Sequence, residues 1–180
     1  MIYTFLADGF EEIEALCPID IMRRAGLTVT TVGIGKKEII GAHDIHVLAD
    51  VADSELVFEN IDLVFLPGGM PGTKNLDNSI TVHKAIDIAI EQDAYIAAIC
   101  AAPMILGKRN LLNGKSAVCY PSFEEYLIGA NVQNDTKLIT DGKIITAMGM
   151  GVSHNLGLEI VRIFCGEEKS NTLRKAIIAD

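Results

Sequence analysis

The chain has 180 residues, of which 49% are hydrophobic, and its 24 acidic and 15 basic residues give a formal net charge of -9. A chain of this length without low-complexity segments predicts one globular domain, residues 1–180, with a sizeable core. No run of lysines or arginines is present, so neither a nucleic-acid-binding nor an anionic-membrane-binding surface is expected. Apolar stretches too short to span a membrane, and an N-terminus without the basic start of a signal peptide, predict a cytoplasmic protein.

Short apolar runs alternate with helical patterns along the chain. Four runs are partly β-branched and bounded by Gly, Pro or Asp, as buried parallel strands are: 2–7, 27–34, 62–67 and 94–99. Helical patterns cover 11–25, 79–92, 102–109 and 151–165, and residues 137–148 predict a hairpin turning at Asp141-Gly142. Residues 36–50 fit neither pattern. The order predicts an α/β fold with a doubly wound, mainly parallel sheet and helices on both faces.

Three unusual stretches follow predicted strands: "LADGFEEIE" after the first strand, "LPGGMPG" after 62–67, and "ICAAP" after 94–99. In doubly wound sheets, ligands bind beyond the carboxyl ends of the strands. The three stretches are therefore expected to meet in one site.

The four cysteines, Cys17, Cys100, Cys119 and Cys165, include no C-x-x-C pair, so their spacing predicts neither a zinc site nor a disulfide framework. Cys100 is distinguished by its place between a predicted strand and a predicted helix, with Ala98 and Ala102 two residues away on either side. Small residues at these positions are typical of a nucleophile elbow. The helix N-terminus that follows favours a thiolate. The alternative is a structural cysteine in an alanine-rich packing seam.

Glu14 is the second candidate, because its neighbours on a helical face are Phe10, Cys17, Pro18 and Ile21. A carboxyl group in such a stripe would have a raised pKa and could donate a hydrogen bond to a thiolate. A surface glutamate is the alternative. Glu11 and Glu12 are expected in the solvated first turn of the helix.

The stretch "PGGMPG" supplies Gly68 and Gly69, whose backbone N–H groups could hold an anion or an oxyanion; a tight turn is an equally compatible interpretation. The chain contains neither G-x-G-x-x-G nor a P-loop, so no nucleotide cofactor is expected. The histidines, His43, His46, His83 and His154, form no metal-spaced pair, and no metal is expected.

The motifs "GFEEIEA", "PGG" and "AICAAP", in this order, resemble the ThiJ/PfpI superfamily, a group with a class I glutamine amidotransferase-like domain. The similarity covers nearly the whole chain and is strongest to the subgroup of the Parkinsonism-associated deglycase and bacterial ThiJ-like proteins. It implies a flavodoxin-like homodimer in which Cys100 is an oxidation-prone nucleophile and Glu14 its protonated partner. It also implies an oxyanion site formed by the N–H groups of Gly69 and Ala101.

Two positions depart from the family pattern. The peptidase branch has a histidine directly after the cysteine, where this chain has Ala101, so proteolysis is not expected. The deglycase branch has a histidine where this chain has Tyr120. A tyrosine phenol, with an ordinary pKa of about 10, is a poor base at neutral pH. His43 lies near a position that reaches the neighbouring subunit's cysteine in relatives, which would place it in the site in trans.

Two functions follow from the resemblance. In the first, Cys100 attacks a small reactive carbonyl compound, as in glyoxalase- or deglycase-like chemistry, with Glu14 moving the proton. In the second, the protein is not an enzyme, and an oxidant converts Cys100 to a sulfinate.

Overall fold

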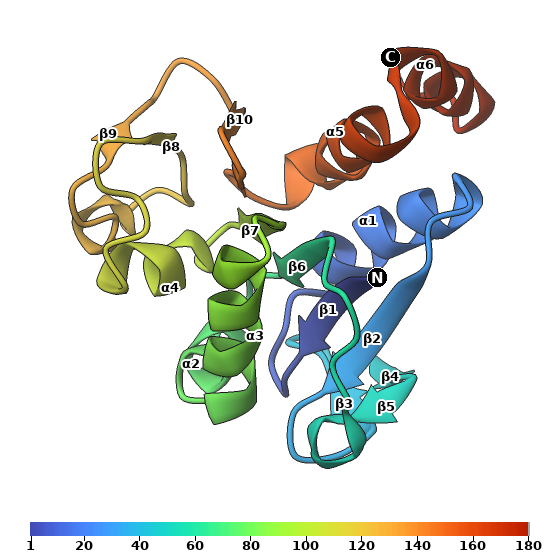
Figure 1. The fold of residues 1–180 in the computed structure, drawn as a ribbon, viewed down its shortest axis with the longest axis vertical. Helices are drawn as coiled ribbons and strands as arrows, with labels where there is room; N and C mark the ends of the chain where they lie inside the picture. The colour runs from blue at the N-terminus through green and yellow to red at the C-terminus, as the bar shows by residue number, and fades with distance from the viewer. Residues whose placement is uncertain (180) are drawn as a thin grey trace.

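A computed structural model gives the fold and describes residues 1–179 (Figure 1). Its main sheet has seven strands among these residues, in the order β10-β11-β7-β6-β1-β2-β5. The strands are β1 (Ile2–Leu6), β2 (Val29–Gly33), β5 (Val51–Ala52), β6 (Leu63–Leu66), β7 (Tyr95–Ile99), β10 (Leu138–Asp141) and β11 (Ile144–Ala147). All neighbours pair parallel except β10 and β11, the predicted hairpin, which pair antiparallel. The predicted mainly parallel sheet is confirmed.

The central strands are apolar on both faces because helices cover both faces of the sheet. In β1, Ile2 and Leu6 pack into one core cluster, whereas Tyr3 and Phe5 pack into the other. This alternation follows from the period of two in a strand. The continuous apolar runs that marked the strands in the sequence are therefore a consequence of burial on both sides.

The helices divide between the two faces as expected for a doubly wound fold (Figure 1). Helices α1 (Glu12–Arg24) and α5 (Ser153–Cys165) cover one face and pack against each other. The other face is covered by α2 (Gly72–Asp77), α3 (Ile80–Glu91) and α4 (Pro103–Lys108). Helix α6 (Glu167–Ala176) packs on α5 near the C-terminus.

Several elements were not predicted from the sequence. Residues 36–50 contain an antiparallel hairpin of β3 (Glu38–Ile40) and β4 (His46–Leu48), separate from the main sheet. A second small sheet pairs β8 (Ser116–Ala117) with β9 (Asn131–Val132), and α6 was also missed. These segments are short or polar, so their sequences carry little periodic signal.

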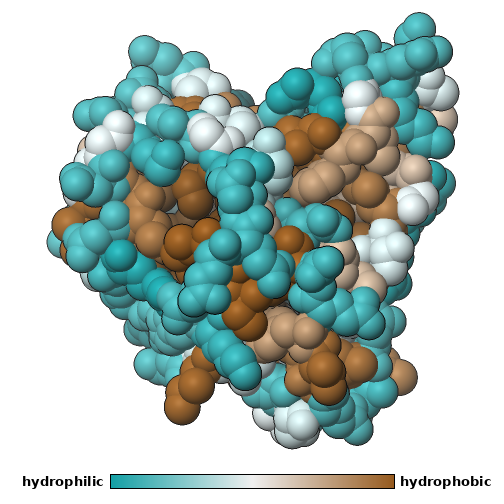
Figure 2. Space-filling model, viewed as in Figure 1, coloured by the Kyte–Doolittle hydropathy of each residue, from teal (hydrophilic) through white to brown (hydrophobic). Residues whose placement is uncertain are grey.

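None of the helices in residues 1–179 is long and apolar enough to cross a membrane. Large apolar side chains that are exposed, such as Leu48, Val57 and Ile80, are spread over several elements. On the face of the molecule seen in Figure 2, apolar residues form separate patches with hydrophilic residues between them. Scattered exposure of this kind is ordinary and does not locate a partner surface, so the homodimer stays a prediction.

Candidate functional site

Cys100 follows the last residue of β7 at a sharp turn. Its φ is 64°, a left-handed conformation that non-glycine residues seldom adopt and that costs of order 1–3 kcal/mol. Ala98 and Ala102 are fully buried on either side. The backbone N–H of Cys100 donates to the Ala147 carbonyl at 2.8 Å, and its carbonyl accepts from the Tyr120 N–H at 2.8 Å. The thiol is thereby held at a strained turn with the geometry expected of a nucleophile elbow.

Glu14 lies in the first turn of α1 and is only 2% exposed. Glu11 caps this helix, and its carboxylate accepts the Glu14 N–H at 2.7 Å. The Oε2 atom of Glu14 has no hydrogen-bond partner of ordinary geometry within residues 1–179. Burial raises the pKa of the Glu14 carboxyl to about 7, opposed in part by the Cys100 thiol and the N–H groups of Gly68 and Met150.

The absence of a side chain on Gly68 allows the Glu14 carboxyl and the Cys100 thiol to lie close together. A Cβ atom on this residue would lie 2.6 Å from the Cys100 Cβ and would also collide with the Glu14 Oε2. Only a residue without a side chain lets the loop after β6 pass between the start of α1 and the end of β7. The predicted residues Cys100, Glu14 and Gly68 therefore lie in contact.

The thiol and the carboxyl share one electrostatic environment. Burial raises the pKa of the Cys100 thiol to about 12, and the negative charge of ionised Glu14 contributes to this increase. The backbone N–H groups of Ala101 and Gly69 act in the opposite direction. That the helix N-terminus favours the thiolate stays a prediction, because α4 starts only at Pro103 and burial of the thiol acts in the opposite direction. A thiolate here requires a protonated Glu14, whose charge no longer opposes it.

A pocket of about 510 Å³ opens above Cys100. Its walls include the predicted residues Glu14, Tyr120 and His43. Lys137, Pro121 and the loop 148–152 also line the pocket and were not predicted from the sequence. This loop directly follows β11, a parallel strand, so the rule that placed the other stretches at the carboxyl edge of the sheet could have found it.

His43 and Glu12 meet at the rim of this pocket. His43 lines the pocket formed by its own chain, and its expected approach to the cysteine of a neighbouring subunit stays a prediction. It lies in the turn between β3 and β4. Glu12 is not in a solvated first turn, because it is 4% exposed and both its carboxylate oxygens bind His43.

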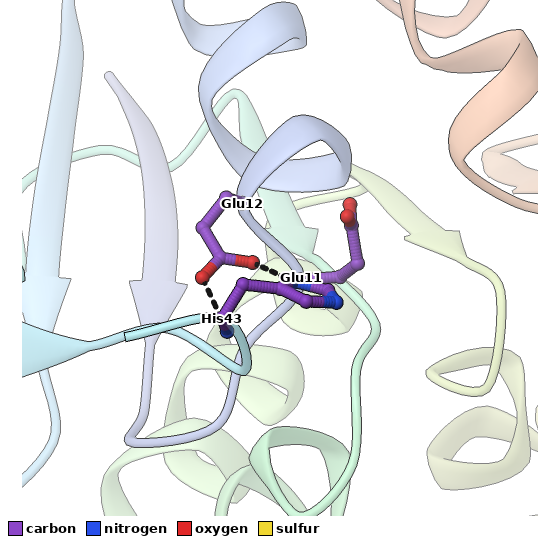
Figure 3. Close-up of side chains that lie close together, drawn as sticks. All are labelled: Glu11, Glu12 and His43. Atoms are coloured by element: carbon purple, nitrogen blue, oxygen red, sulfur yellow. Dashed lines mark hydrogen bonds and ion pairs between the residues drawn. The ribbon is translucent and has the colours of Figure 1, made fainter. Parts of the chain in front are cut away.

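Glu11, Glu12 and His43 each offer one ligand atom, and these atoms lie within 4.8 Å of one another (Figure 3). Hydrogen bonds account for this arrangement: Glu12 accepts from the ring and backbone of His43, and Glu11 caps α1. We therefore assign no metal to the cluster.

The comparisons with known proteins agree with this architecture. The family model "DJ-1/PfpI family" matches residues 1–163. The protein dj-1beta of Drosophila melanogaster is 33% identical over 177 residues, which cover 97% of this chain and 95% of that protein. Its crystal structure superposes with a TM-score of 0.94 over 99% of this chain and 97% of the other. The glutathione-independent glyoxalase DJR-1.2 of Caenorhabditis elegans is 26% identical over 93% of this chain and 89% of its own length. An oxidised DJ-1 from Toxoplasma gondii has a TM-score of 0.93 and 27% identity, covering 98% and 97% of the two chains.

Proposed function

The chain belongs to the DJ-1/PfpI family, and from that membership we propose that it acts on small reactive carbonyl compounds through Cys100. One observation carries the proposal: Cys100 lies at a strained turn in a pocket, against the buried carboxyl of Glu14. A carboxyl with a pKa of about 7 can accept and return a proton near neutral pH. The likeness to a relative named as a glyoxalase supports an α-oxoaldehyde such as methylglyoxal as the substrate.

The reaction begins with addition. The sulfur of Cys100 forms a bond to the aldehyde carbon, and the electron pair of the C=O bond moves to the oxygen. The N–H groups of Gly69 and Ala101, which act to lower the pKa of the Cys100 thiol, would stabilise the developing oxyanion. The thiol proton passes through Glu14 to this oxygen, which gives a hemithioacetal and leaves Glu14 as it started.

The hemithioacetal then rearranges without an external oxidant. A base removes the proton from the former aldehyde carbon and returns it to the neighbouring carbonyl carbon, while the hydroxyl proton on the first carbon moves to the oxygen of the second. The first carbon is thereby oxidised and the second reduced, which yields a thioester of a 2-hydroxy acid. Water cleaves the C–S bond of the thioester, releases the acid and restores the thiol. The net reaction adds one water molecule to the α-oxoaldehyde.

The test is turnover of methylglyoxal to lactate by the wild-type protein and by Cys100→Ser. We expect Cys100→Ser to abolish turnover, whereas Cys17→Ser, a change at a half-buried cysteine outside this pocket, leaves turnover unchanged. Equal turnover by Cys100→Ser and the wild type would refute the assignment of the nucleophile.

The second candidate is a redox-responsive protein in which an oxidant converts Cys100 to a sulfinate. It is favoured by the same buried carboxyl and N–H groups, which suit a sulfinate as well as an oxyanion, and by the likeness to the oxidised relative. Mass spectrometry after limited peroxide treatment tests it. A gain of two oxygen atoms on Cys100, in a protein that does not turn over methylglyoxal, would select this function over the first.

A further inference from the structure

A buried carboxylate holds a histidine at the rim of the Cys100 pocket. The Glu12 side chain is only 6% exposed, and its Oε2 lies 2.8 Å from the Nδ1 atom of His43. Its Oε1 accepts the backbone N–H of the same histidine at 2.7 Å. Figure 3 shows the carboxylate between these two contacts, with the far end of the imidazole ring directed away from it. The ring therefore has a defined orientation although it is 71% exposed.

The loop that carries His43 also contacts the start of α1 and the residue just before its N-cap. The Ala42 N–H donates to the Phe10 carbonyl at 2.8 Å. Gly41 leaves room for Glu12, because a Cβ atom there would lie 2.7 Å from the Glu12 Cγ and closer still to its carboxylate. These contacts join the turn between β3 and β4 to the helix start that bears Glu14.

The contact with Glu12 decides which ring nitrogen is free. A carboxylate only accepts hydrogen bonds, so Nδ1 carries the proton and Nε2 of a neutral ring is an acceptor. Within residues 1–179, Nε2 has no hydrogen-bond partner. His43 and Cys100 line the same pocket, and Glu12 orients the imidazole ring from outside it. A thiol near an imidazole that a carboxylate orients has the components of a proton-transfer site.

We propose that His43, oriented by Glu12, is the base that carries the substrate proton from the first to the second carbon in the hemithioacetal. This inference rests on the proposed function and identifies the base that the rearrangement needs. His43 takes the proton from the carbon bonded to sulfur and returns it to the adjacent carbon, so it ends in its starting state. Glu12 contacts no substrate and acts as a positioning residue.

The other polar groups of the pocket are less suited to this step. Glu14 already serves the addition step, in which it moves the thiol proton, and an ammonium group such as that of Lys137 has no acceptor. A tyrosine such as Tyr120 is a weak base near neutral pH. The hydrogen bond and charge of Glu12 raise the pKa of His43, with smaller contributions in the same direction from Glu11 and Asp44. His43 is the neutral base above this raised pKa, so kcat should fall on the acid side of it.

The experiment compares pH profiles of methylglyoxal turnover in the wild type, His43→Gln, Glu12→Gln and His46→Gln. His46 is the matched control, because its Nδ1 also lies 2.8 Å from a glutamate, Glu38, outside the pocket. We expect His43→Gln to lower kcat about 10²- to 10⁴-fold, the usual contribution of a general base. Glu12→Gln should move the acid limb of kcat to lower pH, because the group that raises the pKa of His43 is lost.

A structural role for His43 is separated from a chemical one by two further measurements. The rate of Cys100 alkylation by iodoacetamide should stay within about twofold of wild type in His43→Gln, which shows that the elbow is intact. Added imidazole should restore part of the activity of His43→Ala, since the position is open to solvent.

The outcomes distinguish this inference from the proposed function. Turnover that needs Cys100 but is unchanged in His43→Gln overturns the role of His43 and leaves the proposed function standing. An acid limb that does not move in Glu12→Gln overturns the role of Glu12. A wild-type protein without turnover of methylglyoxal overturns the proposed function, and the role of His43 with it.

Discussion

Replacing Glu14 by Gln should remove a pH dependence of stability that this buried carboxyl imposes. The folded chain raises the pKa of Glu14 from its ordinary value of 4.5 to about 7. Below pH 4.5 the carboxyl is protonated in both the folded and the unfolded chain. Between pH 4.5 and about 7 the unfolded chain binds fewer protons, so the free energy of unfolding falls as pH rises. The stabilisation is fully present below pH 4.5 and is lost as pH rises through about 7.

The size of the effect follows from the two pKa values. They lie about 2.5 pH units apart, and each unit corresponds to 1.36 kcal/mol, so Glu14 costs the folded chain about 3 kcal/mol above pH 7. A glutamine has nearly the same shape and no charge. The free energy of unfolding of Glu14→Gln, relative to that of the wild type, should therefore rise by up to about 3 kcal/mol between pH 4.5 and pH 8.5.

Urea unfolding at several pH values measures this gain. For each protein, the change in the free energy of unfolding from one pH to another is measured, and the changes in the wild type and Glu14→Gln are compared. A packing cost of the glutamine is the same at every pH, so it does not affect this comparison. Glu91→Gln, at the exposed end of α3, is the control and should parallel the wild type. If the wild type and Glu14→Gln lose stability equally as pH rises, folding does not raise the pKa of the Glu14 carboxyl. That result would refute the reasoning.

Three further predictions follow from the same site. The thiol of Cys100 should titrate about one to two pH units lower in Glu14→Gln than in the wild type, because a neutral amide replaces a carboxylate. Thiolate absorbance against pH measures this, and superimposable curves would show that the charge of Glu14 does not affect the thiol. Gly68→Ala should cost about 1–3 kcal/mol in urea unfolding and slow Cys100 alkylation, since its Cβ would collide with both partners. The control Gly151→Ala, whose Cβ would meet nothing within 4 Å, should leave the free energy of unfolding unchanged. The protein should be a homodimer by light scattering, and a monomer mass at micromolar concentration would disprove this.

Much of the fold was predictable because its signals are local. Buried parallel strands are apolar along their whole length, so residues 62–67 and 94–99 marked β6 and β7 within one or two residues. The turn residues Asp141-Gly142 likewise marked the β10–β11 hairpin, where Gly142 has a φ of 61°. The missed elements depend on their neighbours. Helix α6, for example, is polar along most of its length and packs on α5, where the Ser170 hydroxyl donates to the Leu158 carbonyl at 2.8 Å.

The sequence by itself pointed to Cys100 and Glu14, because a small-x-Cys-x-small turn and a carboxyl among apolar residues are patterns within single segments. Only the tertiary structure decided the state of Glu12 and the place of His43. Glu12 is buried because a loop about 30 residues further along the chain folds over it and supplies two hydrogen bonds. Burial and the direction of pKa shifts depend on groups brought together from distant segments, and no local spacing encodes that approach.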